Sequence, residues 1–281
     1  MIRWYAGTAP LVLDSPHSGV AYPADFGHCL DAATLRRAED THVEKLYDFS
    51  MALGASWVEA LFPRSYIDVN RSLAEVDTSI LADAWPGALA ADTQALAKVR
   101  LGKGLIWRCT DDGTAIYNRH LTAAEVQARI EACWLPYHHA LEQAIEATHR
   151  RHGYCIHLNC HSMPAVAGSH ATEFAGLAHA DFVVGDRDGT TASPQLSQKV
   201  CRYLRGLGYS VEYNHPYKGV ELVRRHSSPA LHRHSIQLEV NRRLYMDEES
   251  LRLNAGFPRL RDDLEQLVLM LLTTDPRDMT D

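Results

Sequence analysis

The hydrophobic positions of this 281-residue chain form short continuous runs that alternate with longer segments of helical spacing. A strand covered on both faces needs apolar side chains at successive positions, so each short run bounded by turn residues predicts a buried strand. Seven strands are predicted, at residues 10–14, 56–61, 66–69, 154–160, 181–184, 209–213 and 235–240. Apolar residues spaced three and four apart predict helices at residues 33–53, 122–153, 194–206 and 260–271.

Start and stop signals refine the predicted helices. Thr122 and Glu125 form a T-x-x-E capping box, in which each side chain accepts a hydrogen bond from a backbone N–H at the start of the helix. Pro136 removes a backbone donor from the same helix, so a kink or a division into two helices is expected before Gly153. Glycine and proline interrupt residues 78–116, and this segment is predicted to be a loop-rich excursion.

The alternation of strands and helices predicts the fold class. It favours an α/β three-layer sandwich, in which helices cover both faces of a mixed, mostly parallel central sheet. No internal repeat, low-complexity tract or linker interrupts the pattern, so residues 1–281 are expected to form a single domain. In such sheets functional groups lie beyond the carboxyl ends of strands, and the polar clusters of this chain follow predicted strands.

Two histidines follow predicted strands in the same way. His17 lies in Ser-Pro-His-Ser-Gly after residues 10–14, and His161 lies in Cys-His-Ser-Met-Pro after residues 154–160. Imidazole nitrogen is a good ligand for zinc and similar metals. We therefore interpret the two histidines as ligands of one shared metal site, with Asn159 as a partner that orients a ligand.

The strand at residues 235–240 carries a polar face. The two-residue period of a strand places Gln237, Glu239 and Asn241 on one side of it. Burying such a face is unfavourable unless something is bound there. A buried carboxylate beside a metal is what a general base for water activation requires, so Glu239 is the candidate catalytic residue. The alternative is a structural glutamate paired with an arginine in the core.

Arginines and amides near other strand ends are candidates for holding an anionic substrate. Arg71 follows residues 66–69, and a guanidinium can bind a carboxylate through two parallel hydrogen bonds. The candidate substrate-binding residues are Asn70, Arg71, Arg187, Arg224, Asn241 and Arg242.

Composition and charge narrow the function classes. The net charge is −7, the pI is about 6.1 and no run of lysine and arginine occurs, so nucleic acid is not an expected partner. The six cysteines contain no C-x-x-C pair, which favours reduced thiols in the cytoplasm over a disulfide framework. Neither a signal segment nor an apolar stretch of membrane-spanning length is seen, so no membrane partner is expected.

Nine segments together resemble the N-formylglutamate amidohydrolase family of histidine degradation. Each segment is short, but their number and order are specific. The segments are LVLDSPHSGVAYPADF, DTHVEKLYDF, FPRSYIDVNRS, GKGLIWR, IYNRHLT, HSMP, VVGDRDGTT, NHPYKGVELVRR and QLEVNRRLYMDE. The resemblance implies a fold similar to that of zinc carboxypeptidases and aspartoacylase-like deacylases.

The resemblance also implies three metal ligands, namely His17, Asp40 and His161. Zinc carboxypeptidases use an early His-x-x-Glu pair, but the residue three positions after His17 is Val20. The acid must therefore come from elsewhere, and Asp40 is expected to supply it from the predicted first helix, with Asp68 or His42 as alternatives. Zinc is the expected metal, with cobalt or iron as alternatives.

The activity implied by the resemblance is metal-dependent hydrolysis of N-formyl-L-glutamate to formate and L-glutamate. The partner is then a small dicarboxylate, and the enzyme is expected to be a monomer or a small homo-oligomer. Three alternatives are a deacylase of another N-acyl acidic amino acid, a thiol hydrolase with Cys160 as nucleophile, and a non-catalytic dicarboxylate-binding module. Strand alternation disfavours the thiol hydrolase, because the side chains of Cys160 and His161 point to opposite faces.

Overall fold

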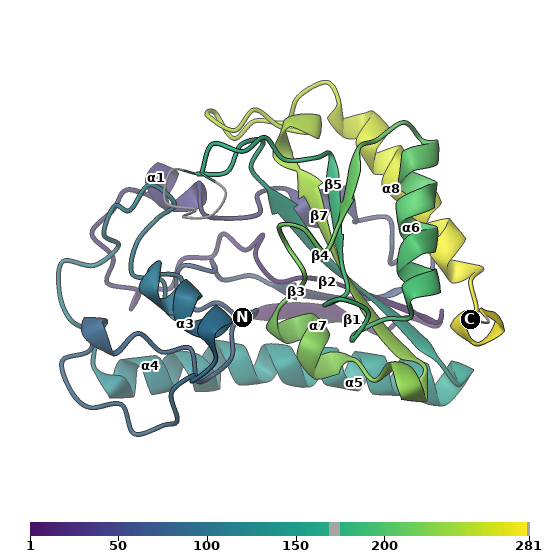
Figure 1. Ribbon diagram of the computed structural model, residues 1–281. Coiled ribbons are helices and arrows are strands. Elements are labelled where there is room, and N and C mark those ends of the chain that lie inside the picture. The colour runs from purple at the N-terminus through teal and green to yellow at the C-terminus, as the bar shows by residue number, and fades with distance from the viewer. Residues whose placement is uncertain (169–174, 280–281) are drawn as a thin grey trace.

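The computed structural model describes residues 1–168 and 175–279, and strands from the whole length of the chain meet in one sheet (Figure 1). In chain order the strands are β1 (Ile2–Tyr5), β2 (Leu11–Ser15), β3 (Ser56–Ala60), β4 (Cys155–Met163), β5 (Phe182–Gly185), β6 (Val211–Tyr213) and β7 (Arg233–Asn241). Their order across the sheet is β1-β3-β2-β4-β7-β5-β6. The pairings are parallel except for β1 with β3 and β5 with β7, which are antiparallel.

Helices cover both faces of this sheet. They are α1 (Ala32–Arg36), α2 (Val43–Leu46), α3 (Thr93–Arg100), α4 (Ala123–Arg129), α5 (Leu135–His152), α6 (Pro194–Gly206), α7 (Glu221–His226) and α8 (Phe257–Leu272). Short 3-10 turns lie at Thr78–Ile80, Pro229–Leu231, Arg242–Leu244 and Pro276–Asp278. The long helix α5 packs on β1 to β4, while α6 and α8 pack together and form the opposite layer (Figure 1). The predicted three-layer α/β sandwich is confirmed.

The central strand β4 divides its side chains between the two layers. Leu158 and Cys160 belong to the hydrophobic core under α6 and α8. His157, Asn159 and His161 alternate with them and are at most 2% exposed, so they lie on the opposite face, toward α5. This alternation places a column of buried polar groups beside the carboxyl ends of β2, β4 and β7.

The prediction of one helix over residues 33–53 is wrong. The segment contains two short helices, α1 and α2, because His42 adopts a left-handed backbone conformation (φ 69°) that an α-helix does not tolerate. The predicted helical position of Asp40 is therefore also wrong, and this residue lies in the connection between α1 and α2.

The prediction of a strand at residues 66–69 is also wrong. The segment is a series of turns, in which the backbone N–H of Tyr66 bonds to the carbonyl of Pro63. The carboxylate of Asp68 accepts a hydrogen bond from the backbone N–H of Asn70, a local bond that competes with a strand ladder.

The predicted helix over residues 122–153 is present with an interruption. The capping box of Thr122 and Glu125 is confirmed, and Gly153 ends the helix with φ 76°. A π-helical turn at Ile130–Trp134 separates α4 from α5 just before Pro136, so the expected division is confirmed. The six other predicted strands and helices α6 and α8 are confirmed within a few residues, whereas β1, α3 and α7 were not predicted. No helix in the described part of the chain is long and apolar enough to cross a membrane.

Candidate metal centre

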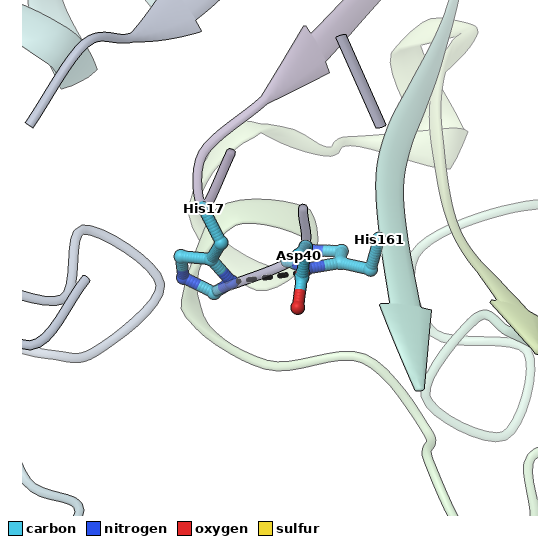
Figure 2. Close-up of side chains that lie close together, drawn as sticks. All are labelled: His17, Asp40 and His161. Atoms are coloured by element: carbon cyan, nitrogen blue, oxygen red, sulfur yellow. Dashed lines mark hydrogen bonds and ion pairs between the residues drawn. The ribbon is translucent and has the colours of Figure 1, made fainter. Parts of the chain in front are cut away.

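Three side chains converge at the carboxyl ends of β2 and β4. His17 follows β2 by two residues, His161 lies near the end of β4, and Asp40 comes from the connection between α1 and α2. One nitrogen or oxygen atom of each lies within 4.8 Å of the others, and Figure 2 shows the carboxylate of Asp40 directed toward both imidazole rings. All three side chains are buried. The structure thus brings together the three residues expected as metal ligands.

The same nitrogen of each imidazole faces the carboxylate. Nδ1 of His17 lies 3.4 Å from Oδ2 of Asp40, and Nδ1 of His161 lies 3.0 Å from the same oxygen. The two rings are 4.8 Å apart between centroids. Two nitrogens and one oxygen therefore converge on a single point.

The other nitrogen of each imidazole is held by an acceptor. Nε2 of His17 donates to Oδ1 of Asp68 at 2.8 Å, and Nε2 of His161 donates to the amide oxygen Oδ1 of Asn159 at 2.8 Å. A neutral imidazole carries one proton, so these bonds leave the lone pair of each Nδ1 directed at Asp40. Outer partners of this kind fix the tautomer and direction of metal-binding histidines.

The residues present fit a divalent metal ion. Nδ1 of His17 is buried and has no hydrogen-bond partner among the described residues. With both protons on Nε2, three electron-rich atoms face one another without a hydrogen between them, and a cation at that point removes their repulsion. Two nitrogens and one carboxylate oxygen are also the donor set of hydrolytic zinc sites, which leave a fourth position open.

Charge stabilises the ionised form of both acids around this point. Burial favours the neutral form of Asp40, but its contacts with His161 and His17 and the charge of Arg64 hold its pKa well below the usual range. Burial likewise opposes ionisation of Asp68, and the charges of His17 and Arg64 outweigh it and lower the pKa of that carboxyl. Both groups are therefore carboxylates at neutral pH.

Two arginines complete the surroundings of Asp40. Nη2 of Arg242 lies 3.1 Å from Oδ1 of Asp40, and Nη1 of Arg64 lies 3.4 Å from the same oxygen. Arg64 also donates to Oδ2 of Asp68 at 3.1 Å. Asp40 thus presents one oxygen to the arginines and the other to the histidines.

Glu239 lies beside the three converging residues. It pairs with His161 in the parallel register of β4 and β7, and its Oε1 accepts a hydrogen bond from Nε2 of Gln237 at 2.9 Å. Burial raises the pKa of Glu239 above the usual range, the charge of His161 lowers it, and the charge of Asp40 raises it further. A buried carboxylate of raised pKa next to a metal-type site is suited to accept a proton.

The predicted substrate-binding residues fall into two groups. Asn70 lies at the centre, with Nδ2 3.3 Å from Nε2 of His161, and Arg242 contacts Asp40 as described. Arg71 adjoins Asn70 and donates to the carbonyl of Lys103 at 2.9 Å.

The other three candidates bond elsewhere. Arg187 donates to the carbonyl of Gly219, and Asn241 donates to the carbonyl of Ala180. Arg224 is exposed and forms an ion pair with Glu221, three residues away on α7. Their contacts give them local structural partners, and none touches the converging residues.

The alternative ligands and the alternative nucleophile also have other surroundings. Asp68 bonds to the far nitrogen of His17 and acts as its outer partner. His42 bonds to the carbonyl of Leu251. Cys160 is fully buried in the core under α6 and α8, and burial raises the pKa of its thiol well above the usual value, which disfavours a thiolate.

Sequence reasoning missed a group of cations around Trp107. The guanidinium of Arg64 lies 4.7 Å and Nζ of Lys103 lies 5.0 Å from the centre of the Trp107 ring, whose Nε1 donates to Asp68. Burial lowers the pKa of Lys103 to about 7, and the charge of Arg64 adds to this shift. The segment GKGLIWR contains Lys103 and Trp107 and was the available signal.

Tyr217 was also missed. Burial raises the pKa of its hydroxyl, and the nearby charge of Glu239 adds to the shift, so the ring faces the site from the loop after β6. The segment NHPYKG was the available signal.

The fold and the three converging side chains define an α/β protein with a buried His, Asp, His metal-type centre. The chain belongs to the N-formylglutamate amidohydrolase family, whose sequence pattern matches residues 9–246. Curated N-formylglutamate deformylases of Pseudomonas putida and Pseudomonas aeruginosa are each 28% identical to it, over 88% and 89% of this chain and 86% and 87% of theirs.

Solved structures agree with this assignment. The N-formylglutamate amidohydrolase of Ralstonia eutropha JMP134 is 44% identical, with a TM-score of 0.91 over 99% of both chains. A gene product of Agrobacterium tumefaciens, 16% identical, shares the fold with a TM-score of 0.68 over 97% of this chain and 93% of its own.

Proposed function

We propose that this chain is a metal-dependent amidohydrolase that converts N-formyl-L-glutamate to formate and L-glutamate in histidine degradation. One observation carries the proposal: two buried imidazoles direct Nδ1 at one oxygen of Asp40, at 3.4 and 3.0 Å, beside the buried carboxylate of Glu239. Family membership supports the substrate, because the curated relatives are named N-formylglutamate deformylase. The six free cysteines support a reducing compartment, the cytoplasm.

His17, Asp40 and His161 are the proposed ligands, and zinc is the proposed metal, with cobalt or iron as alternatives at the same donor set. When bound, a divalent ion supplies Lewis-acid chemistry by polarising the formyl oxygen and making water more acidic. Asp68 and Asn159 hold the two imidazoles in the ligating direction.

Glu239 is the proposed general base. Its carboxylate accepts a proton from the attacking water as the water oxygen bonds to the formyl carbon. The same group then delivers this proton to the amide nitrogen as the carbon–nitrogen bond breaks, which releases formate and the amine of glutamate. The raised pKa of Glu239 brings its proton affinity closer to that needed for both transfers.

The cations around Trp107 are the proposed site for the substrate carboxylates. Arg71 and Lys103 are linked through a backbone hydrogen bond of 2.9 Å, and Lys103 and Arg64 both lie against the Trp107 ring. The net charge of −7 repels a dianion at long range, so local cations are needed to bind it. Arg242 neutralises Asp40 and is proposed to stay with it.

Metal analysis combined with formate release tests the proposal. Purified protein is expected to contain about one divalent ion per chain and to release formate from N-formyl-L-glutamate. Chelation should abolish the release and added Zn²⁺ should restore it, whereas iodoacetamide should leave it intact. N-acetyl- and N-succinyl-L-glutamate serve as parallel substrates, and faster turnover of either would assign a different deacylase activity. Absence of both metal and formate would refute the proposal.

A further inference from the structure

A buried carboxylate lies one residue beyond the histidine ligand of β4. Asp14, on β2, is paired with Asn159 of β4 in the parallel register, and the side chains of both are fully buried. Oδ1 of Asp14 accepts a hydrogen bond from Nδ2 of Asn159 at 2.8 Å, and Oδ1 of Asn159 accepts one from Nε2 of His161 at 2.8 Å. A continuous chain of short hydrogen bonds therefore runs from Asp14 through an amide to a proposed metal ligand.

Other groups fix the carboxylate of Asp14 in place. Its Oδ2 accepts a hydrogen bond from the hydroxyl of Tyr137 on α5 at 2.7 Å, and its Oδ1 lies 3.0 Å from Nε2 of His157. Burial opposes ionisation, but His157 and the hydrogen bonds lower the pKa of Asp14, so it remains a carboxylate at neutral pH. An ionised carboxylate only accepts hydrogen bonds.

This property decides which way the Asn159 amide faces. The NH₂ group must point at Asp14, because the flipped amide would place its oxygen against the carboxylate in a site with no access to water. The amide oxygen then points at His161 and accepts a proton from Nε2, which leaves the Nδ1 lone pair for the metal. Asn70 also presents an NH₂ group to Nε2 of His161, but at 3.3 Å, and its contact does not specify this tautomer.

We infer that Asp14 is a positioning residue for the metal centre, acting through the amide of Asn159 to hold His161 with Nδ1 free to ligate. His17 obtains the same support directly from the carboxylate of Asp68. The inference rests on the proposed metal site, and it assigns to a fully buried acid a role in metal affinity.

Zn²⁺ affinity of the metal-stripped full-length protein, measured by competition with a chelator, tests the inference. Asp14→Asn should weaken Zn²⁺ binding about 10- to 100-fold, the range found when outer partners of metal ligands are removed. Asn159→Asp alone places two carboxylates within hydrogen-bond distance and should also impair the site. The double variant Asp14→Asn/Asn159→Asp exchanges the two groups, returns a carboxylate to the metal centre, and should bind Zn²⁺ within about threefold of the wild type.

Tyr137→Phe is the matched control. It removes a hydrogen bond to Asp14 without changing the amide of Asn159, so it should lower Tm but keep Zn²⁺ affinity within about threefold. A folded Asp14→Asn protein with wild-type affinity would overturn the inference. If Asp14→Asn does not fold, the exchanged double variant decides, and its failure to fold or to regain affinity counts against the inference. A wild-type protein that binds no divalent metal would instead refute the proposed function and the inference together.

Discussion

Glu239→Gln separates the chemistry of the site from its assembly. The substitution keeps the size of the side chain and an oxygen that can still accept the 2.9 Å bond from Gln237. None of the contacts among His17, Asp40 and His161 involves Glu239, so the metal content should remain at the wild-type level. Only the negative charge and the basicity of Glu239 are lost.

The structure sets the size of the expected effect. Glu239 is 8% exposed, so bulk water has little access to replace it as a proton acceptor. Positioned general bases contribute about 10²- to 10⁴-fold to rate, which corresponds to about 3 to 5 kcal/mol of transition-state stabilisation. We expect kcat for formate release to fall by this factor while KM changes little.

Steady-state formate release and metal analysis of the same preparation measure both quantities. Glu212→Gln, an exposed glutamate on β6, is the matched control and should behave as the wild type. The pH profile gives a second reading, because loss of activity on acidification reflects protonation of Glu239, whose pKa is raised by burial. A Glu239→Gln enzyme with full metal content and kcat within tenfold of the wild type would refute the general-base assignment.

Three further predictions concern residues around the site. Cys160→Ala should lower Tm but keep kcat within about twofold, because the thiol packs in the core, and a folded but inactive protein would revive the thiol mechanism. Lys103→Met should raise KM about tenfold or more, since a hydrogen bond to a charged group contributes roughly 1.5 to 3 kcal/mol. Because burial lowers the pKa of Lys103 to about 7, substrate binding should weaken in the wild type, and not in the variant, as pH rises through that value. Glu39 is 1% exposed, and burial raises its pKa to about 7, so the folded state holds a proton that the unfolded chain releases. Its stability contribution is present below the ordinary glutamate pKa and lost as pH rises through 7, and urea unfolding of wild type and Glu39→Gln should differ in this pH dependence by up to about 3 kcal/mol; parallel pH profiles would contradict this.

The residues that sequence reasoning placed well are those whose position follows from strand geometry. His161 and Glu239 lie on adjacent parallel strands, and the two-residue period alone assigns their side chains to the polar face. The same period assigns Cys160 to the opposite core. Asp40 was expected through family resemblance, and its backbone was wrongly predicted as helical because the apolar spacing around it hides the left-handed turn at His42.

The residues that were missed or misplaced depend on contacts between distant segments. Arg64 and Lys103 meet at Trp107 through loops, and no local pattern encodes that meeting. Arg224 has the composition of an anion-binding residue, but it pairs with Glu221 one turn away on the same helix. A charged residue on a loop therefore has no predictable partner until the fold is known.

The division of β4 between an apolar and a polar face also bears on how reliably the chain finds its native pairing. A slip of one residue would turn Leu158 and Cys160 toward the site and send Asn159 and His161 into the hydrophobic core under α6 and α8. Burying an amide and an imidazole there without partners costs several kcal/mol, and the slip would lose apolar burial as well. The groups proposed to bind the metal thus also specify the register of the central strand before any metal is bound, so variants that make this column apolar are expected to misfold more often as well as to lose the site.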